Sequence, residues 1–235
     1  DALATTIRRW IEPRGRGASP KFIAGESYGG FRAPKIAHRL QVDQGVGVNG
    51  LVLVSPVLDF ARSQSSRSPL DHVARLPSYA AAYRGLGRTL SRADLADVET
   101  YARGGYLSDL MAGVKDEAAL ARLSARVSEL TGLPRELTSR YAGRVPMNVF
   151  VDEFRRADKN VVSMYDAHVA GIDPSPYGQG PGAQDQMRLG LHAPIVQAMV
   201  GLYRDKLEWF PPNSRYFFQN EQAGRQWDWG DRSRQ

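Results

Sequence analysis

The sequence contains no cysteine, which excludes disulfide bonds, thiolate metal ligands and a cysteine nucleophile within these 235 residues. It also lacks long apolar runs. The longest strongly apolar stretch, residues 50–58, has the length of a strand, whereas a membrane-spanning helix needs about 18 apolar residues or more. We expect no membrane span, because no apolar run is long enough. No basic segment followed by an apolar one opens the chain, so no signal peptide is visible.

Charge of one sign is not concentrated anywhere along the chain. Lys and Arg number 31 against 25 Asp and Glu, a net charge of +6, and the arginines are scattered apart from small clusters such as residues 14–16 and 155–156. Nucleic-acid surfaces more often show a dense basic stripe with interleaved aromatics. We expect ordinary solvated arginines and no nucleic-acid partner. Hydrophobic residues at 42% and charged residues at 24% are typical of a globular protein.

The first 60 residues predict alternating helices and strands. Apolar residues recur at helical spacing over residues 2–12 and 33–40. Short continuous apolar runs, which are typical of strands, lie at 21–25 and 50–55. This βαβ order is typical of a parallel sheet in an α/β fold. The apolar runs are near-continuous, which favours strands covered on both faces.

Beyond residue 60 the pattern becomes mostly helical. Residues 61–209 are expected to form a large, mostly helical cap inserted into the α/β core, and residues 210–235 a segment returning toward that core. The clearest local patterns are helices at 91–101, 116–130 and 189–207 and a strand within a hairpin at 160–165.

Residues 25–30 (GESYGG) contain the motif G-x-S-x-G between a predicted strand and a predicted helix. This context is that of a nucleophile elbow, a sharp turn that lifts a serine hydroxyl above the sheet. Ser27 is then the candidate nucleophile, and the N–H of Tyr28 one donor to the oxyanion. Gly25 and Gly29, two positions either side of the serine, keep backbone atoms from colliding, and Gly30 completes the turn. An incidental serine in a tight turn is the alternative.

Three segments together resemble the serine carboxypeptidase family, in particular its bacterial, cysteine-free branch. They are GESYGG at 25–30, APKIA at 33–37 and LVLVSPVLD at 51–59, with weaker likeness at 76–80, 165–167 and 227–229. Plant and fungal members are rich in disulfides and usually carry an aromatic residue where this chain has Arg32, which separates the chain from them.

The resemblance implies an α/β-hydrolase fold with a cap, and hydrolysis of a peptide at its C-terminal residue through an acyl-enzyme on Ser27. It assigns Tyr28 to the oxyanion site and Glu26 to binding the terminal carboxylate of the substrate. A carboxylate binds another carboxylate when the two share a proton, so such a site favours acid pH. An ordinary salt bridge to a nearby arginine is the alternative for Glu26. The expected partner is a peptide with a free C-terminus.

A serine nucleophile needs a base, and the base needs an orienting carboxylate. The four histidines, His38, His72, His168 and His192, are expected to be solvent-exposed or capping residues. The local pairs Asp166 with His168 and Asp185 with His192 do not lie on strand ends. The resemblance places the catalytic Asp and His after residue 235 and a Gly-rich oxyanion loop before residue 1. We therefore expect an incomplete α/β-hydrolase sheet, a fragment that is inactive by itself.

The sequence contains no recognisable motif for binding a metal ion or a cofactor. HExxH, calcium-loop, phosphate-loop and dinucleotide motifs are missing, so we expect neither metal nor cofactor. Two alternatives to a carboxypeptidase stay open. One is another acyl-transfer enzyme on the same fold, such as an esterase, an acyltransferase or a prolyl-oligopeptidase-like peptidase. The other is a non-catalytic hydrolase-like binding domain. The resemblance suggests a periplasmic or secreted protein, while the pattern leaves oligomeric state and side-chain specificity open.

Overall fold

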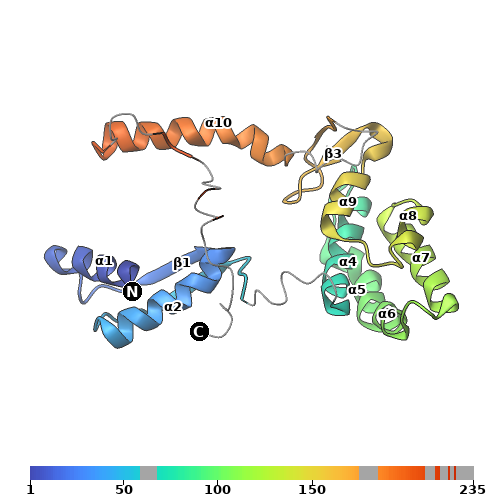
Figure 1. The fold of residues 1–235 in the computed structure, drawn as a ribbon, viewed down its shortest axis with the longest axis horizontal. Coiled ribbons are helices and arrows are strands. Elements are labelled where there is room, and N and C mark those ends of the chain that lie inside the picture. Colours follow the sequence, from blue (N-terminus) through green and yellow to red (C-terminus); the bar gives the residue numbers. More distant parts are fainter. Residues whose placement is uncertain (59–67, 175–184, 210–214, 218–221, 223–224, 226–235) are drawn as a thin grey trace. The chain divides into compact units, whose positions relative to one another are not determined.

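The computed structural model describes residues 1–58, 68–174, 185–209, 215–217, 222 and 225. Within them the chain forms two compact units, one made of residues 1–58 and the other of the described residues from 68 onward (Figure 1). The expected boundary at residue 60 lies outside the described residues, as does most of the expected return segment 210–235. The helical segment that was expected to be a cap makes up the second unit.

The first unit follows the predicted order of helix, strand, helix and strand. Helix α1 spans Ala2–Ile11, strand β1 Phe22–Glu26, helix α2 Tyr28–Asp43 and strand β2 Gly50–Val54. The 3₁₀ turn Glu12–Arg14 follows α1, and Gly15 ends it in the left-handed conformation at φ 61°. The two strands are parallel and pair from Phe22 with Gly50 to Glu26 with Val54. The described part of this unit is therefore an α/β structure with a small parallel sheet.

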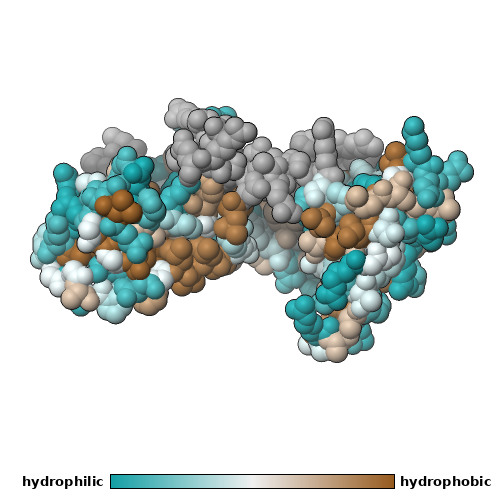
Figure 2. Space-filling view, turned by 90° about the horizontal axis from the view of Figure 1, so that it is seen from below, coloured by the Kyte–Doolittle hydropathy of each residue, from teal (hydrophilic) through white to brown (hydrophobic). Residues whose placement is uncertain are grey.

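Within the described residues of the first unit, helices cover the two-stranded sheet on one face. Helix α2 packs against both strands and buries Leu40, and α1 packs on α2. On the opposite face Phe22, Val52 and Val54 are 66%, 51% and 51% exposed. The expectation of strands buried on both faces is wrong for these residues, because no described element of the unit lies on that face. Figure 2 shows apolar surface over both units.

The second unit is mostly helical, as predicted. Its helices and strands are α4 (Pro69–Arg84), α5 (Ala96–Tyr101), α6 (Leu107–Ala112), α7 (Glu117–Thr131), α8 (Arg135–Arg140), α9 (Met147–Glu153), β3 (Asn160–Val162), β4 (Ala170–Ile172) and α10 (Gln186–Gly201). Short 3₁₀ turns at Arg92–Leu95 and Arg156–Asp158 and π-helical turns at Ala102–Tyr106 and Leu202–Lys206 join or extend them. Ser91 and Asp94 form a reciprocal capping box before α5.

The core of this unit lies between α4, α7 and the π-helical turn Ala102–Tyr106. Leu76, Leu123 and Val127 are at most 1% exposed there. Tyr106 is buried with them, and its hydroxyl donates a 2.7 Å hydrogen bond to the carbonyl of Gly143, which satisfies the buried oxygen. The helix predicted at residues 116–130 is thus α7, and the face that carries Leu123 and Val127 packs into the core.

Strands β3 and β4 form the antiparallel hairpin predicted around residues 160–165. Asp185 joins this hairpin to α10. Its carboxylate accepts hydrogen bonds from the Ser163 hydroxyl at 2.9 Å, the Met164 N–H at 2.7 Å and the N–H groups of Met187 and Arg188. It therefore acts as the N-cap of α10 and does not pair with His192 as an acid–base couple.

Candidate functional site

Ser27 lies at the junction of β1 and α2 with a left-handed backbone, φ 52° and ψ −113°. Its N–H donates to the Val54 carbonyl at 3.0 Å, and its own carbonyl accepts from the N–H groups of Gly30 and Val57, each at 3.0 Å. Three backbone hydrogen bonds thus hold a conformation that costs a residue with a Cβ about 1–3 kcal/mol. The predicted strand–turn–helix context of the G-x-S-x-G motif is present.

The three glycines of the turn differ in how closely they are packed. A Cβ on Gly25 would overlap the carbonyl of Gly29, and a Cβ on Gly30 would overlap the Cβ and the backbone Cα of Pro56. A Cβ on Gly29 would meet no described atom within 4 Å. The prediction that Gly29 relieves a steric clash by lacking a Cβ is therefore wrong, because the Gly29 backbone, not its Cβ position, makes the close approach to Gly25.

Tyr28 is the first residue of the 16-residue helix α2, so its N–H has no acceptor within the helix. The partial positive charge of the helix N-terminus adds to that N–H, a combination that favours an anion beside the serine. The Tyr28 ring lies under the guanidinium of Arg32, with the Arg32 Cζ 4.7 Å from the ring centroid. The two backbone features that an oxyanion site needs thus coincide at this turn.

Glu26 is the last residue of β1 and is exposed. Within the described part of the chain, neither its carboxylate nor the Ser27 hydroxyl makes a side-chain hydrogen bond or an ion pair. The alternative role of Glu26, a salt bridge to an arginine, is therefore not seen among these residues. Glu26 and Ser27 are adjacent groups at the carboxyl end of a parallel strand, where ligands commonly bind in α/β sheets.

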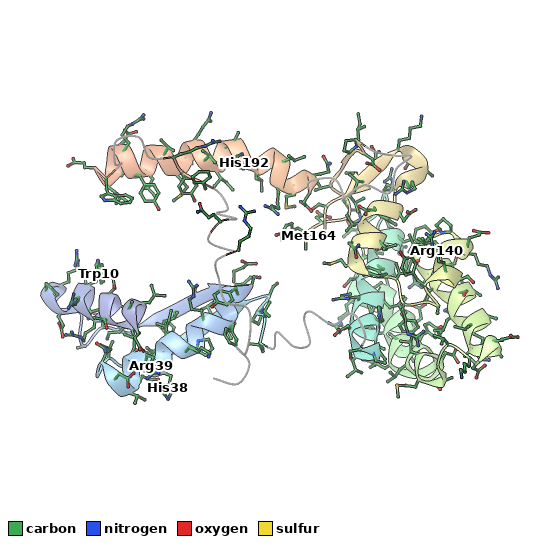
Figure 3. All side chains as sticks on the ribbon, in the orientation of Figure 1. Trp10, His38, Arg39, Arg140, Met164 and His192 are labelled. Carbon is green, nitrogen blue, oxygen red and sulfur yellow. The ribbon has the colours of Figure 1, made fainter. Side chains whose placement is uncertain are left out.

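The described part of the first unit contains one histidine, His38, and it is remote from Ser27. His38 is exposed on α2, ten residues beyond the helix start, about 15 Å along the axis at ~1.5 Å per residue (Figure 3). It carries no base function for the serine from that position.

The other three histidines belong to the second unit. His72 is 3% exposed, so the expectation of an exposed or capping residue is wrong for it. The helical repeat of α4 places it one turn before the buried Leu76, on the core side. His168 is exposed as predicted, with its Nδ1 3.1 Å from the Asp166 carboxylate in the β3–β4 turn. His192 is exposed on α10 (Figure 3).

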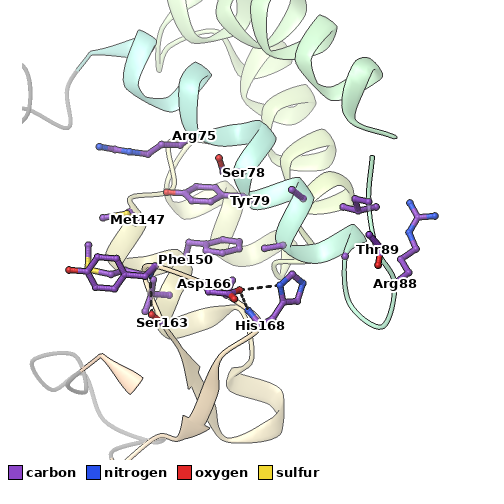
Figure 4. A pocket seen from close by; sticks show the side chains of 18 residues that line it. Arg75, Ser78, Tyr79, Arg88, Thr89, Met147, Phe150, Ser163, Asp166 and His168 are labelled. Carbon is purple, nitrogen blue, oxygen red and sulfur yellow. Dashed lines mark hydrogen bonds and ion pairs between the residues drawn. The ribbon is translucent and has the colours of Figure 1, made fainter. Parts of the chain in front are cut away.

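A cavity of about 590 Å³ in the second unit had no counterpart in the sequence motifs. Arg75 and Tyr79 of α4, Phe150 of α9 and the Asp166–His168 pair are among the residues that line it (Figure 4). The spacing of Arg75 and Tyr79, one helical turn apart, was the one available signal in the sequence, and it is too common to indicate a site.

Replacing Ser27 with Gly is expected to stabilise the first unit relative to Ser27→Ala by about 1 kcal/mol, because glycine adopts φ 52° without the Cβ clash. Alanine retains the clash and removes the same hydroxyl, so it is the matched control. Urea unfolding followed by circular dichroism measures the difference. Equal stability of the two variants would show that the turn is not strained.

Among the described residues, no three or more histidine or acidic side chains are grouped so as to hold a metal ion. None of the helices searched in these residues is long and apolar enough to cross a membrane.

Comparison of this chain with family models, with curated proteins and with solved structures finds no match in any of the three.

Proposed function

We propose that the first unit carries the nucleophile elbow of a serine-type hydrolase, and that the enzyme is a serine carboxypeptidase of the family that residues 25–30 resemble. The observation that supports this most directly is the left-handed backbone of Ser27 between a parallel strand and the start of a helix. An incidental serine in an ordinary turn has no need of that conformation, which carries a steric cost for every residue but glycine.

In this proposal the Ser27 Oγ attacks the carbonyl carbon of the last peptide bond of the substrate. The negative charge that develops on the carbonyl oxygen faces the Tyr28 N–H at the N-terminus of α2. The amine of the terminal residue leaves with a proton, and water then hydrolyses the acyl-serine ester. Glu26, exposed and without an ion pair among the described residues, binds the terminal carboxylate through a shared proton.

The proton transfers in this scheme need a base that the described part of the first unit does not supply. His38 is too far from Ser27, and the Ser27 hydroxyl has no hydrogen-bond partner among the described residues. We therefore expect the 235 residues by themselves to release no C-terminal amino acid from a blocked dipeptide. That same observation favours, as second candidate, a domain that binds peptides without cleaving them.

Substitution of Ser27 by Cys tests the elbow without requiring a base. Because the chain has no cysteine, the variant carries a single thiol. A thiolate at the N-terminus of a long helix is stabilised by the helix dipole, so the thiol pKa is expected to fall about one to two units below its usual ~8.5. The rate of alkylation by iodoacetamide between pH 5 and pH 10 measures it.

The matched control is Ser139→Cys, at an exposed serine in the last turn of α8, where the partial charge of the helix has the opposite sign. Its thiol is expected to titrate at or above the usual pKa. If both thiols titrate alike, the turn does not stabilise an anion and the hydrolase proposal fails. A depressed pKa at position 27 only is the result that supports it.

A further inference from the structure

The cavity of about 590 Å³ in the second unit has the size of a small-molecule site, for which about 300–1,000 Å³ is usual. It is formed by α4, the residues that follow it, α9 and the turn between β3 and β4, all within one compact unit. Its lining is mostly apolar with a few polar groups, and Figure 4 shows Arg75 on the opposite side of the pocket from Arg88 and His168.

One polar group in the lining has no partner. Tyr79 is 8% exposed, and its hydroxyl is buried without a hydrogen bond among the described residues. The ring is stacked on Phe150 with centroids 4.1 Å apart and planes 6° from parallel, so the hydroxyl is held in place. Burial raises the pKa of Tyr79 to about 12, which keeps the hydroxyl protonated. A buried hydroxyl without a hydrogen bond is unfavourable, and a bound acceptor would offset that cost.

Arg75 lies one turn before Tyr79 on α4, and its charge acts on the Tyr79 hydroxyl. Figure 4 shows both groups at the same end of the pocket. Arg75 makes neither a hydrogen bond nor an ion pair within the described part of the chain. A guanidinium and a hydroxyl at one end of a cavity offer several N–H donors and one O–H donor, the set that a carboxylate accepts.

The other described charged groups of the lining have partners. His168 pairs with Asp166 at 3.1 Å, and Arg88 lies 3.8 Å from Asp94. The end of the pocket at Arg75 therefore carries the uncompensated positive charge among the lining residues that the structure describes. A cationic ligand would be repelled by Arg75 at that end.

The apolar part of the lining is exposed and rich in thioether and ring groups. Met147, Met164 and Tyr165 are 36%, 48% and 59% exposed, although all three are large apolar or aromatic residues. Thioether sulfurs make favourable contacts with aromatic rings, and Met side chains adapt to the shape of a bound group. A ring bound there would cover side chains that otherwise face water.

We propose that this pocket binds an aromatic carboxylate, with the carboxylate on Arg75 and Tyr79 and the ring among Met147, Met164 and Tyr165. The site is formed within the second unit, and this proposal does not depend on the hydrolase proposal. The bound group is a free acid or the carboxyl end of a peptide, since both present the same chemistry to the pocket.

The test is a titration of the full chain with 3-phenylpropanoate, followed by calorimetry or by chemical shifts of the Met methyl groups. Saturable binding is expected, and the uncharged 3-phenylpropanamide should bind about tenfold more weakly or worse. Arg75→Gln should weaken binding of the acid by a similar factor. Arg103→Gln, an exposed arginine of the π-helical turn that does not line the pocket, is the matched control and should leave the affinity unchanged.

Tyr79→Phe separates a ligand-binding role from a structural one. It removes the unpartnered hydroxyl, so the free protein should melt about 2–4 °C higher while affinity for 3-phenylpropanoate falls about three- to tenfold. N-acetylphenylalanine and a short peptide ending in phenylalanine distinguish a free acid from a peptide end. Equal binding of acid and amide, unchanged affinity in Arg75→Gln, or a lower melting temperature of Tyr79→Phe would each overturn the proposal.

Discussion

Alanine at position 25 is expected to unfold the first unit or to destabilise it by about 3 kcal/mol or more. The added Cβ would overlap the carbonyl of Gly29, a backbone atom that three neighbouring hydrogen bonds at Ser27 prevent from moving. Gly30→Ala should cost a comparable amount, because its Cβ would overlap both the Cβ and the backbone Cα of Pro56, on the segment that follows β2. Chemical denaturation followed by fluorescence reports on this unit when Trp209, Trp227 and Trp229 are replaced by Phe in every protein compared, so that Trp10 is the one tryptophan.

Gly29→Ala is the matched control for both variants. It lies in the first turn of α2, has no positive φ, and leaves open space around its Cβ among the described residues. Alanine is the better helix former by about 1 kcal/mol, so this variant should be as stable as the parent or more stable. If all three variants lose stability equally, the close approach of β1 to the start of α2 is not as the structure has it.

Replacing Glu26 with Gln is expected to lower peptide cleavage by about tenfold or more in any preparation of this protein that hydrolyses peptides, and to leave ester cleavage almost unchanged. The reason is that a peptide presents a terminal carboxylate beside Glu26, and the short hydrogen bond with a shared proton is lost with the carboxyl group. The advantage of the parent over the variant should be largest in acid and vanish toward neutral pH, since sharing needs one proton between two acids.

Glu12→Gln controls for loss of a carboxylate in the same unit. Glu12 is exposed and pairs with Arg8 at 2.7 Å, a surface pair that contributes little, so both activities should be retained. Equal losses of peptide and ester cleavage in Glu26→Gln would favour another acyl-transfer enzyme on the proposed fold. A pH profile that is identical in parent and variant would remove Glu26 from the binding of the carboxylate.

Local chemistry made several features predictable. The turn at Ser27 depends on a serine between a strand and a helix with glycine at position 25, and the capping box depends on Ser91 and Asp94, three residues apart. The hairpin at β3 and the core face of α7 likewise follow from periods of two and 3.6 residues. Each of these is decided within a few residues of the chain, which is the range over which backbone geometry and hydrogen bonding act.

The sequence by itself therefore determined the α/β order of the first 58 residues, the position of Ser27 in a turn and the mostly helical nature of the second unit. The tertiary structure decided which glycine meets Pro56, why His72 is buried, and that Arg75 and Tyr79 line a cavity. These three features depend on the packing of surfaces from segments that lie far apart in the sequence. A helical period says which residues share a face, while the neighbour that covers that face is set by the packing of the whole unit.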